Sequence, residues 1–267
     1  MEILILPTAG HAERLAARIV ADRVAAKPDL VLGCATGRTM EGIYGELVRI
    51  SRAEGIDYAR VRTFNLDEYV GLTADDPRSY HHYMQEMLFR HVNLRPENTH
   101  LPNGAAADLA AEAARYEAEI AAAGGIDLQL LGLGNSGHIG FNEPLSSLMS
   151  RTREKALAPQ TRKQNAGMFG GDPDAVPPRA LTMGVGTILE AREVLMIATG
   201  AHKAEILATA TEGPITAMVS ATALQLHPRC HVLVDEAAAA RLAGHEYYRW
   251  TLENEPDWAP YRELVRA

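Results

Sequence analysis

The chain has 267 residues, of which 47% are hydrophobic and 22% charged, and its formal net charge is −8. This mixture is typical of a globular protein and excludes a disordered or fibrous chain. The negative charge, without a basic stripe, argues against a nucleic-acid partner. A small phosphorylated ligand remains compatible with it, because such a ligand needs only a few donors gathered locally.

The two cysteines, Cys34 and Cys230, lie far apart without metal-ligand spacing. They fit a reducing compartment and argue against a disulfide scaffold. The start, MEILILP, lacks the basic residues and cleavage site of a signal peptide. No stretch reaches the ~18 apolar residues that span a bilayer. We expect a soluble cytoplasmic protein with no membrane partner and no metal.

Short β-rich runs alternate with longer helical patterns, and this alternation predicts a mostly parallel sheet with helices on both faces. We expect strands near residues 2–6, 30–32, 61–65, 126–131, 194–199 and 231–234, and helices over 11–26, 39–55, 108–124 and in a pattern that ends at 223–226. A chain of this length commonly forms one α/β domain. We therefore predict a single Rossmann-like domain over residues 1–267.

Residues 159–178 read PQTRKQNAGMFGGDPDAVPP and interrupt the alternation with polar residues, glycine and proline. Irregular segments of this length inside a compact domain are usually binding loops or lids. A disordered surface insertion is the alternative. We predict an active-site lid over about residues 159–182.

In open parallel sheets, ligands bind outside the carboxyl ends of the strands. The second predicted strand is followed by GCATGRTMEGIY, a small-residue turn that leads into a helix. Its backbone N–H groups and the hydroxyls of Thr36 and Thr39 could hold a phosphate. Threonine is also a good N-cap, so capping alone would explain these residues.

The third predicted strand is followed by TFNLDEYVGL, which places Asp67 and Glu68 at the strand end. Adjacent residues in an extended backbone point to opposite sides, so at most one of the two carboxylates faces a given site. Solvated or capping carboxylates are the ordinary interpretation of such a pair. The neighbouring phosphate-like turn favours a functional role for one of them.

The fourth predicted strand is followed by LLGLGNSGHIGFNEP. Its glycines match the dinucleotide fingerprint G-x-G-x-x-G, but that motif should open a helix and this segment runs on to Pro144. We interpret it as a tight loop that brings His138 close to a ligand. Glu143, five positions later, could fold back to hold the tautomer and charge of the imidazole. A structural histidine is the alternative.

The fifth predicted strand is followed by ATGAHKAEIL, which places Lys203 in the first turn of a helix. A cation there is unfavourable to the helix dipole, and an anionic ligand would explain it. A solvated surface lysine is the alternative.

The motifs ATGRT, FNLDEYVGL, GLGNSGHIGFNEP and SSLMSRTREK resemble the glucosamine-6-phosphate deaminase family, and the resemblance extends along the chain to LQLHP at 224–228. It implies isomerisation of an aldose to a ketose with loss of the amine, giving fructose 6-phosphate and ammonia without a cofactor. Related alternatives are a galactosamine-6-phosphate deaminase/isomerase, a 6-phosphogluconolactonase-like hydrolase and a non-catalytic sugar-phosphate sensor. Sensors of this architecture normally carry a helix-turn-helix segment first, whereas this chain begins with a strand.

The resemblance also implies roles for the catalytic residues. Asp67 would take the C2 proton and return it at C1, His138 would assist ring opening, and Glu143 would orient the imidazole. A carboxylate and an imidazole suit these proton transfers near neutral pH. Ser136 stands where known members carry an aspartate that completes the relay to the histidine.

The substrate phosphate would be held by the turn after the second strand and the lysine after the fifth, that is by Thr36, Gly37, Arg38, Thr39 and Lys203. The lid of known members often carries an arginine where this chain has Gly167. We expect Arg38 and Lys203 to supply the missing charge. Arg162 or Lys163 of the lid are the alternative.

Regulated members of the family bind an effector phosphate where this chain has Ser146, Arg153 and Lys155. In an extended segment, Arg153 and Lys155 would point to one side. The resemblance thus implies a response to N-acetylglucosamine 6-phosphate, with a solvated strand face as the alternative. Family members range from monomers to hexamers, so a homo-oligomer is compatible with the sequence.

Overall fold

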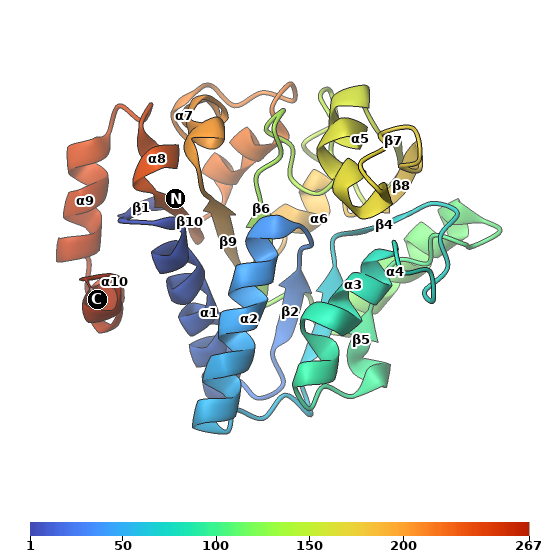
Figure 1. Cartoon of the computed structure of the whole chain (residues 1–267), viewed down its shortest axis with the longest axis horizontal. Coiled ribbons are helices and arrows are strands. Elements are labelled where there is room, and N and C mark those ends of the chain that lie inside the picture. The colour runs from blue at the N-terminus through green and yellow to red at the C-terminus, as the bar shows by residue number, and fades with distance from the viewer. Residues whose placement is uncertain (267) are drawn as a thin grey trace.

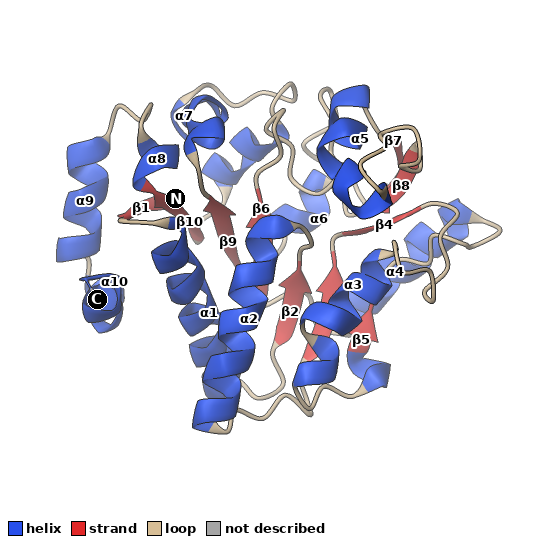
Figure 2. Cartoon of the chain, viewed as in Figure 1, coloured by secondary structure: helices blue, strands red, loops and turns tan. Residues whose placement is uncertain are grey.

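A seven-stranded parallel sheet forms the centre of the computed structural model, which describes residues 1–266 (Figures 1 and 2). In spatial order its strands are β1 (Glu2–Leu6), β10 (Cys230–Asp235), β9 (Glu193–Ala198), β6 (Leu128–Gly132), β2 (Val31–Cys34), β3 (Arg62–Asn65) and β5 (Thr99–His100). The inner strands β9, β10 and β2 are buried along their whole length, as expected for a sheet covered on both faces.

Helices cover both faces of this sheet (Figure 1). They are α1 (Ala9–Ala26), α2 (Arg38–Glu54), α3 (Tyr80–Met87), α4 (Leu109–Ala122), α5 (Pro159–Asn165), α6 (Val185–Leu189), α7 (Ala204–Glu212), α8 (Glu236–Ala239), α9 (His245–Asn254) and α10 (Arg262–Arg266). Helices α1 and α2 pack side by side on one face. None of the helices within residues 1–266 is both long and apolar enough to cross a membrane.

The sequence of α2 illustrates why these helices dock on the sheet. Its buried side chains include Met40, Ile43, Tyr44 and Leu47, at the i, i+3, i+4, i+7 spacing of one helix face. The helix begins after Gly37, whose φ of 113° lies in a region that favours glycine. The chain can therefore turn sharply from the end of β2 into the helix.

A second sheet of three antiparallel strands lies beyond the carboxyl edge of the main sheet. It contains β4 (Asp67–Tyr69), β8 (Arg179–Thr182) and β7 (Arg153–Ala156) in that order. A separate apolar cluster packs beneath it, with Tyr69 in contact with the rings of Tyr80, Phe141 and Phe169. This cluster fixes the start of β4, and hence Asp67, against the neighbouring loops.

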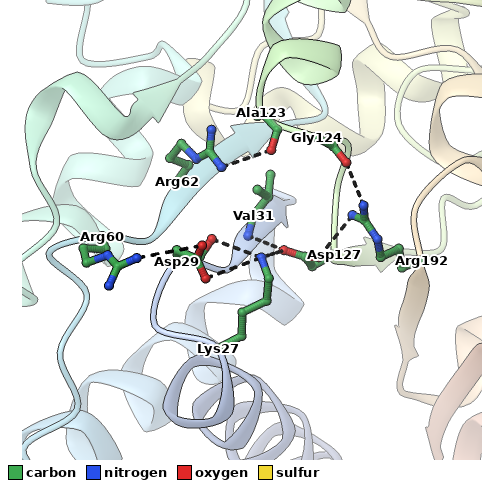
Figure 3. A network of polar contacts seen from close by, with 9 residues as sticks. All are labelled: Lys27, Asp29, Val31, Arg60, Arg62, Ala123, Gly124, Asp127 and Arg192. Atoms are coloured by element: carbon green, nitrogen blue, oxygen red, sulfur yellow. Dashed lines mark hydrogen bonds and ion pairs between the residues drawn. The ribbon is translucent and has the colours of Figure 1, made fainter.

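Polar contacts join the chain at the opposite, amino edge of the main sheet (Figure 3). The carboxylate of Asp127 accepts hydrogen bonds from Lys27 Nζ at 2.6 Å and from Val31 N at 2.8 Å. Arg192 bonds the same carboxylate at 3.1 Å, and Arg62 donates to the carbonyl of Ala123 at 3.0 Å. The cations at this edge are thus bound to the protein's own carboxylates and carbonyls.

The six strands expected from the sequence are all present, each displaced by no more than two residues at either end. Strand β5 and the small sheet were not predicted, because β5 and β4 have only two and three residues and β7 and β8 are short polar or mixed runs. The segment 223–226 ends a 3₁₀ helix, Ser220–Leu226, instead of an α-helix.

The segment predicted as an irregular lid is more regular than its composition indicates. Residues 159–165 form α5, a 3₁₀ turn follows at Ala166–Phe169, and residues 179–182 form β8. Pro159 occupies the first position of α5, where its missing N–H costs nothing. Helix and strand thus occupy both ends of the segment predicted as a lid, and Gly170 to Pro178 is the part without helix or strand.

Candidate active site

A cavity of about 620 Å³ opens at the carboxyl edge of the main sheet. Each of the four loops selected from the sequence contributes to its walls, together with residues of α3 and of the segment 164–168. The parallel strands bring these loops together because their carboxyl ends meet at one edge of the sheet.

The turn after β2 forms one wall of the cavity through Thr36, Gly37, Arg38 and Thr39. Gly37 is the N-cap residue of α2, and no side chain caps the helix. The interpretation of these threonines as N-caps is therefore wrong. The first N–H groups of a helix lack partners within the helix, so this turn offers hydrogen-bond donors to an anion in the cavity.

Asp67 and Glu68 point to different surroundings, as their extended backbone predicts. Asp67 lines the cavity, whereas the carboxylate of Glu68 accepts hydrogen bonds from the backbone N–H groups of Tyr69, Tyr80 and His81 at 2.8 to 3.0 Å. Glu68 thereby ties β4 to the start of α3. A buried acid thus faces the cavity and its neighbour serves a structural role.

The ionisation of both acids reflects their burial. Burial, and then the neighbouring charge of Glu68, hold the pKa of Asp67 well above its usual range. Burial raises the pKa of Glu68 to about 7, although its three backbone donors oppose that shift. A carboxyl group with a raised pKa is suited to accept and return a proton near neutral pH.

The loop after β6 carries His138 into the cavity wall. A Cβ atom at Gly134 would lie 2.2 Å from His138 Nε2, so only glycine allows this close approach. The loop does not continue into a helix, which confirms that it is not a dinucleotide-binding motif.

Two side chains lie against the other imidazole nitrogen of His138. Ser136 Oγ is 2.8 Å from Nδ1, and Glu143 Oε2 is 4.0 Å from the same atom. The other oxygen of Glu143 accepts a hydrogen bond from Ala158 N at 2.9 Å. Burial lowers the pKa of His138, and the charge of Glu143 opposes this. The predicted grouping of Ser136, His138 and Glu143 is therefore present.

Lys203 ends a 3₁₀ turn, Ala201–Lys203, directly before α7, and it lines the cavity. It is buried, and its ammonium donates to Asn135 Oδ1 at 2.6 Å. No carboxylate within residues 1–266 lies within ion-pair distance of it, and burial lowers its pKa to about 8. A buried ammonium without a counter-ion favours binding of an anion.

The cations of the lid segment differ in position from Arg38. Arg162 donates to the carbonyls of Val176 and Asp174, both at 3.1 Å, so it braces the segment internally. Neither Arg162 nor Lys163 lines the cavity, whereas Arg38 does. This arrangement favours Arg38 over the lid cations as the donor to an anion.

The three residues of the expected effector site lie beside the small sheet. Arg153 and Lys155 alternate on β7, and Ser146 lies in the preceding loop. Arg153 donates to Asn142 Oδ1 at 2.8 Å but forms no ion pair within the described chain, and the buried hydroxyl of Ser146 has no hydrogen-bond partner there. No hydrogen bond joins the three residues to one another.

Several residues that line the cavity were not identified from the sequence, namely Tyr80, Tyr83, Asn135, Gln164 and His202. Asn135 and His202 flank predicted site residues, and that proximity was the only available signal. Gln164 Oε1 accepts from Asn135 N at 3.1 Å and so joins α5 to the loop after β6. The tyrosines come from α3, whose position depends on tertiary contacts.

This fold and site define the class of protein: an open α/β sheet whose carboxyl edge holds a buried acid, an imidazole and an uncompensated lysine around one cavity. The chain belongs to the family of glucosamine-6-phosphate isomerases and 6-phosphogluconolactonases, whose model matches residues 8–232.

Relatives within this family are similar over nearly the whole chain. The chain is 49% identical to glucosamine-6-phosphate deaminase of Arthrobacter sp. (strain FB24) and 48% identical to that of Mycolicibacterium smegmatis, each over 97% of this chain and 99% of the relative. A solved monomeric glucosamine-6-phosphate deaminase superposes with a TM-score of 0.88 at 45% identity, over 90% of this chain and 100% of that one. A 6-phosphogluconolactonase from Leishmania guyanensis, at 19% identity and a TM-score of 0.70 over 89% of this chain and 97% of its own, shares the fold.

Proposed function

We propose that this chain is a glucosamine-6-phosphate deaminase, which converts glucosamine 6-phosphate and water into fructose 6-phosphate and ammonia. The observation that carries the proposal is the convergence of Asp67, His138 and Lys203 on one cavity. The identity of 45 to 49% to deaminases over 90 to 97% of this chain supports the same reaction.

His138 acts first, in ring opening. Its Nδ1 side is occupied by Ser136 and Glu143, which leaves Nε2 to exchange a proton with the ring oxygen of the substrate. Glu143 stabilises the positive charge that the imidazole acquires during the transfer. The product of this step is the open-chain aldehyde.

Asp67 then takes the proton from C2 of the aldehyde and delivers a proton to C1. The intermediate is an enolamine, and protonation at C1 converts it into the imine of the ketose. Water adds to the imine carbon and ammonia leaves, so the reaction balances without an oxidant or reductant. The raised pKa of Asp67 makes the return of the proton favourable.

The phosphate of the substrate binds at the opposite side of the cavity. Backbone N–H groups of the turn 36–39, the guanidinium of Arg38 and the ammonium of Lys203 provide its donors. Residues 159–182 act as the lid, and the hydrogen bond from Asn135 N to Gln164 holds the lid against the catalytic loop. The lid excludes water while the enolamine is present.

A second, regulatory anion site involves Ser146, Arg153 and Lys155, and its ligand is N-acetylglucosamine 6-phosphate. A half-buried guanidinium without an ion pair and a buried hydroxyl without a partner support an anion at this place. An effector that binds across subunits of a homo-oligomer is compatible with this position. The buried free thiols Cys34 and Cys230 fit a cytoplasmic enzyme.

The experiment that tests the proposed function measures ammonia and fructose 6-phosphate from purified protein. Glucosamine 6-phosphate should give both products in equal amounts, and N-acetylglucosamine 6-phosphate should give neither. Galactosamine 6-phosphate tests the preference at C4. Hydrolysis of 6-phosphogluconolactone without release of ammonia from any aminosugar phosphate would contradict the proposal.

A further inference from the structure

Two tyrosines hold the backbone of the turn between β2 and α2. The hydroxyl of Tyr44, on α2, donates to the carbonyl of Ala35 at 2.7 Å, and the hydroxyl of Tyr83, on α3, donates to the carbonyl of Gly37 at 2.9 Å. The carbonyls on the two sides of Thr36 are therefore both fixed by side chains from neighbouring helices.

These two bonds determine where the N–H groups of the turn point. Both peptide units are trans and planar, so the carbonyl and the N–H of one unit point in opposite directions. Because the Ala35 carbonyl faces Tyr44, the N–H of Thr36 must point away from Tyr44. Because the Gly37 carbonyl faces Tyr83, the N–H of Arg38 must likewise point away from Tyr83. Within residues 1–266, no protein acceptor bonds the N–H of Thr36 or Arg38.

The Gly37 carbonyl also accepts a hydrogen bond from Met40 N at 2.9 Å in the first turn of α2, so Tyr83 reinforces an orientation that the helix favours. Gly37 itself places little steric limit on this peptide. Its φ is 113°, and no atom of the described residues lies within 4 Å of the position that a Cβ would occupy. A rotation of the Gly37–Arg38 peptide would replace an N–H donor by a carbonyl oxygen, which repels an anion.

We infer that Tyr83, together with Tyr44, is a positioning residue for phosphate recognition, because it fixes the peptide planes whose N–H groups bind the anion. The inference rests on the proposed function, in which this turn binds the phosphate of the substrate. Neither tyrosine hydroxyl reacts with the substrate in this role.

Tyr83 also links the phosphate turn to the catalytic acid. It lies on α3, and Glu68, next to Asp67, accepts hydrogen bonds from the first N–H groups of that helix. Helix α3 thus connects the surroundings of Asp67, the proposed catalytic base, with the turn that binds the phosphate. Burial raises the pKa of the Tyr83 hydroxyl, so it remains a proton donor across the working pH range.

The test is Tyr83→Phe, which removes one oxygen atom and keeps the ring. Without the Tyr83 hydroxyl, the N–H of Arg38 is no longer held toward the phosphate. The KM for glucosamine 6-phosphate and the inhibition constant of inorganic phosphate should each rise about five- to tenfold, and kcat should stay within about twofold of wild type. Calorimetry with inorganic phosphate measures the same loss without catalysis. Tyr44→Phe should shift the same constants in the same direction.

Tyr58→Phe is the matched control. Tyr58 is also fully buried and its hydroxyl bonds Ser51 Oγ at 2.8 Å, but it lies at the far end of α2 and does not line the cavity. The Tyr58→Phe variant should be less stable than the wild type but should bind phosphate with the same affinity.

The outcomes separate the inference from the proposed function. If the wild type releases ammonia and binds inorganic phosphate, but Tyr83→Phe keeps both the KM and the phosphate affinity within twofold, the inference is wrong and the function stands. The same conclusion follows if Tyr58→Phe weakens phosphate binding as much as Tyr83→Phe does. A wild type without ammonia release overturns the proposed function itself.

Discussion

The guanidinium of Arg38 lies beside Gly167, such that a Cβ atom at position 167 would be 3.6 Å from Arg38 Nη2. A side chain that starts α2 thus reaches Gly167, the position at which the resemblance implies an arginine in the lid. Arg38 thus brings a positive charge next to position 167 from the start of α2. This relationship supports the proposal that Arg38 is a phosphate donor.

Arg38→Ala should therefore raise the KM for glucosamine 6-phosphate about tenfold or more and change kcat much less, since a charge-assisted hydrogen bond contributes about 1.5 to 3 kcal/mol. Steady-state kinetics measures both constants. Arg162→Ala is the control and should change KM little, because Arg162 bonds Val176 and Asp174 instead of lining the cavity. A KM within twofold of wild type for Arg38→Ala would remove this residue from the phosphate site.

The same relationship predicts a rescue. Gly167 does not have a positive φ, and among residues 1–266 the end of the Arg38 side chain is the only atom within 4 Å of its Cβ position. In the Arg38→Ala background, Gly167→Arg should therefore be tolerated and should lower KM again at least severalfold. Gly167→Leu in that background controls for volume alone and should leave KM high.

The acid limb of the pH profile should depend on Glu68. Asp67 must be ionised to take the C2 proton, and Glu68 contributes to its raised pKa, so activity falls as the pH drops through that pKa. Glu68→Gln removes the negative charge and should move the acid limb of kcat/KM to lower pH, by about half a unit or more. Burial is the larger cause of the raised pKa of Asp67, so an unchanged or upward-shifted limb would show that the charge of Glu68 does not act on Asp67.

The carboxylate of Glu143 should set the charge state of His138. Glu143→Gln removes a negative charge 4.0 Å from Nδ1, so the pKa of the imidazole should fall further below its ordinary value. Proton NMR titration of the ring measures this shift, and kcat should drop about tenfold because the imidazolium is less stable. A rise of the imidazole pKa in this variant would show that Glu143 does not act on His138 by charge.

The effector site predicts cooperative kinetics. Wild-type enzyme should give sigmoidal rates that N-acetylglucosamine 6-phosphate makes hyperbolic, and Arg153→Ala should lose the response while the activated kcat stays within about twofold. Rates as a function of substrate concentration, with and without the effector, test this. Hyperbolic kinetics that the effector leaves unchanged would remove the regulatory proposal.

The sequence was sufficient to predict the parallel sheet and the loops that line the cavity, because β-rich runs and helical periodicity are local signals. Asp67, Glu68 and His138 could be placed for the same reason, since each lies in a segment that follows a predicted strand. The ends of α5 and the small sheet were not predictable. Helix α5 is a seven-residue polar helix with weak local signals, and β7 and β8 depend on their pairing with each other.

Contacts between segments that are distant along the chain could not be predicted from the sequence. The bond from Tyr83 to the carbonyl of Gly37 joins residues 46 positions apart, and no pattern in α3 indicates it. The closeness of Arg38 to Gly167 depends in the same way on how the lid segment packs over α2. The residue types alone led us to expect that Arg38 supplies a positive charge that Gly167 cannot. The distance between these two residues is known only from the fold.

The measurement that tests the account most directly follows the hydrogen at C2 of the substrate. With glucosamine 6-phosphate deuterated at C2, wild-type enzyme should move the deuteron to C1 of fructose 6-phosphate or to solvent as ammonia is released. Asp67→Asn keeps the shape of the side chain but cannot take the proton, so the label should remain at C2 and turnover should vanish, with substrate affinity within about tenfold. Loss of the C2 label by Asp67→Asn at more than about a tenth of the wild-type rate would contradict the assignment of Asp67 as the base.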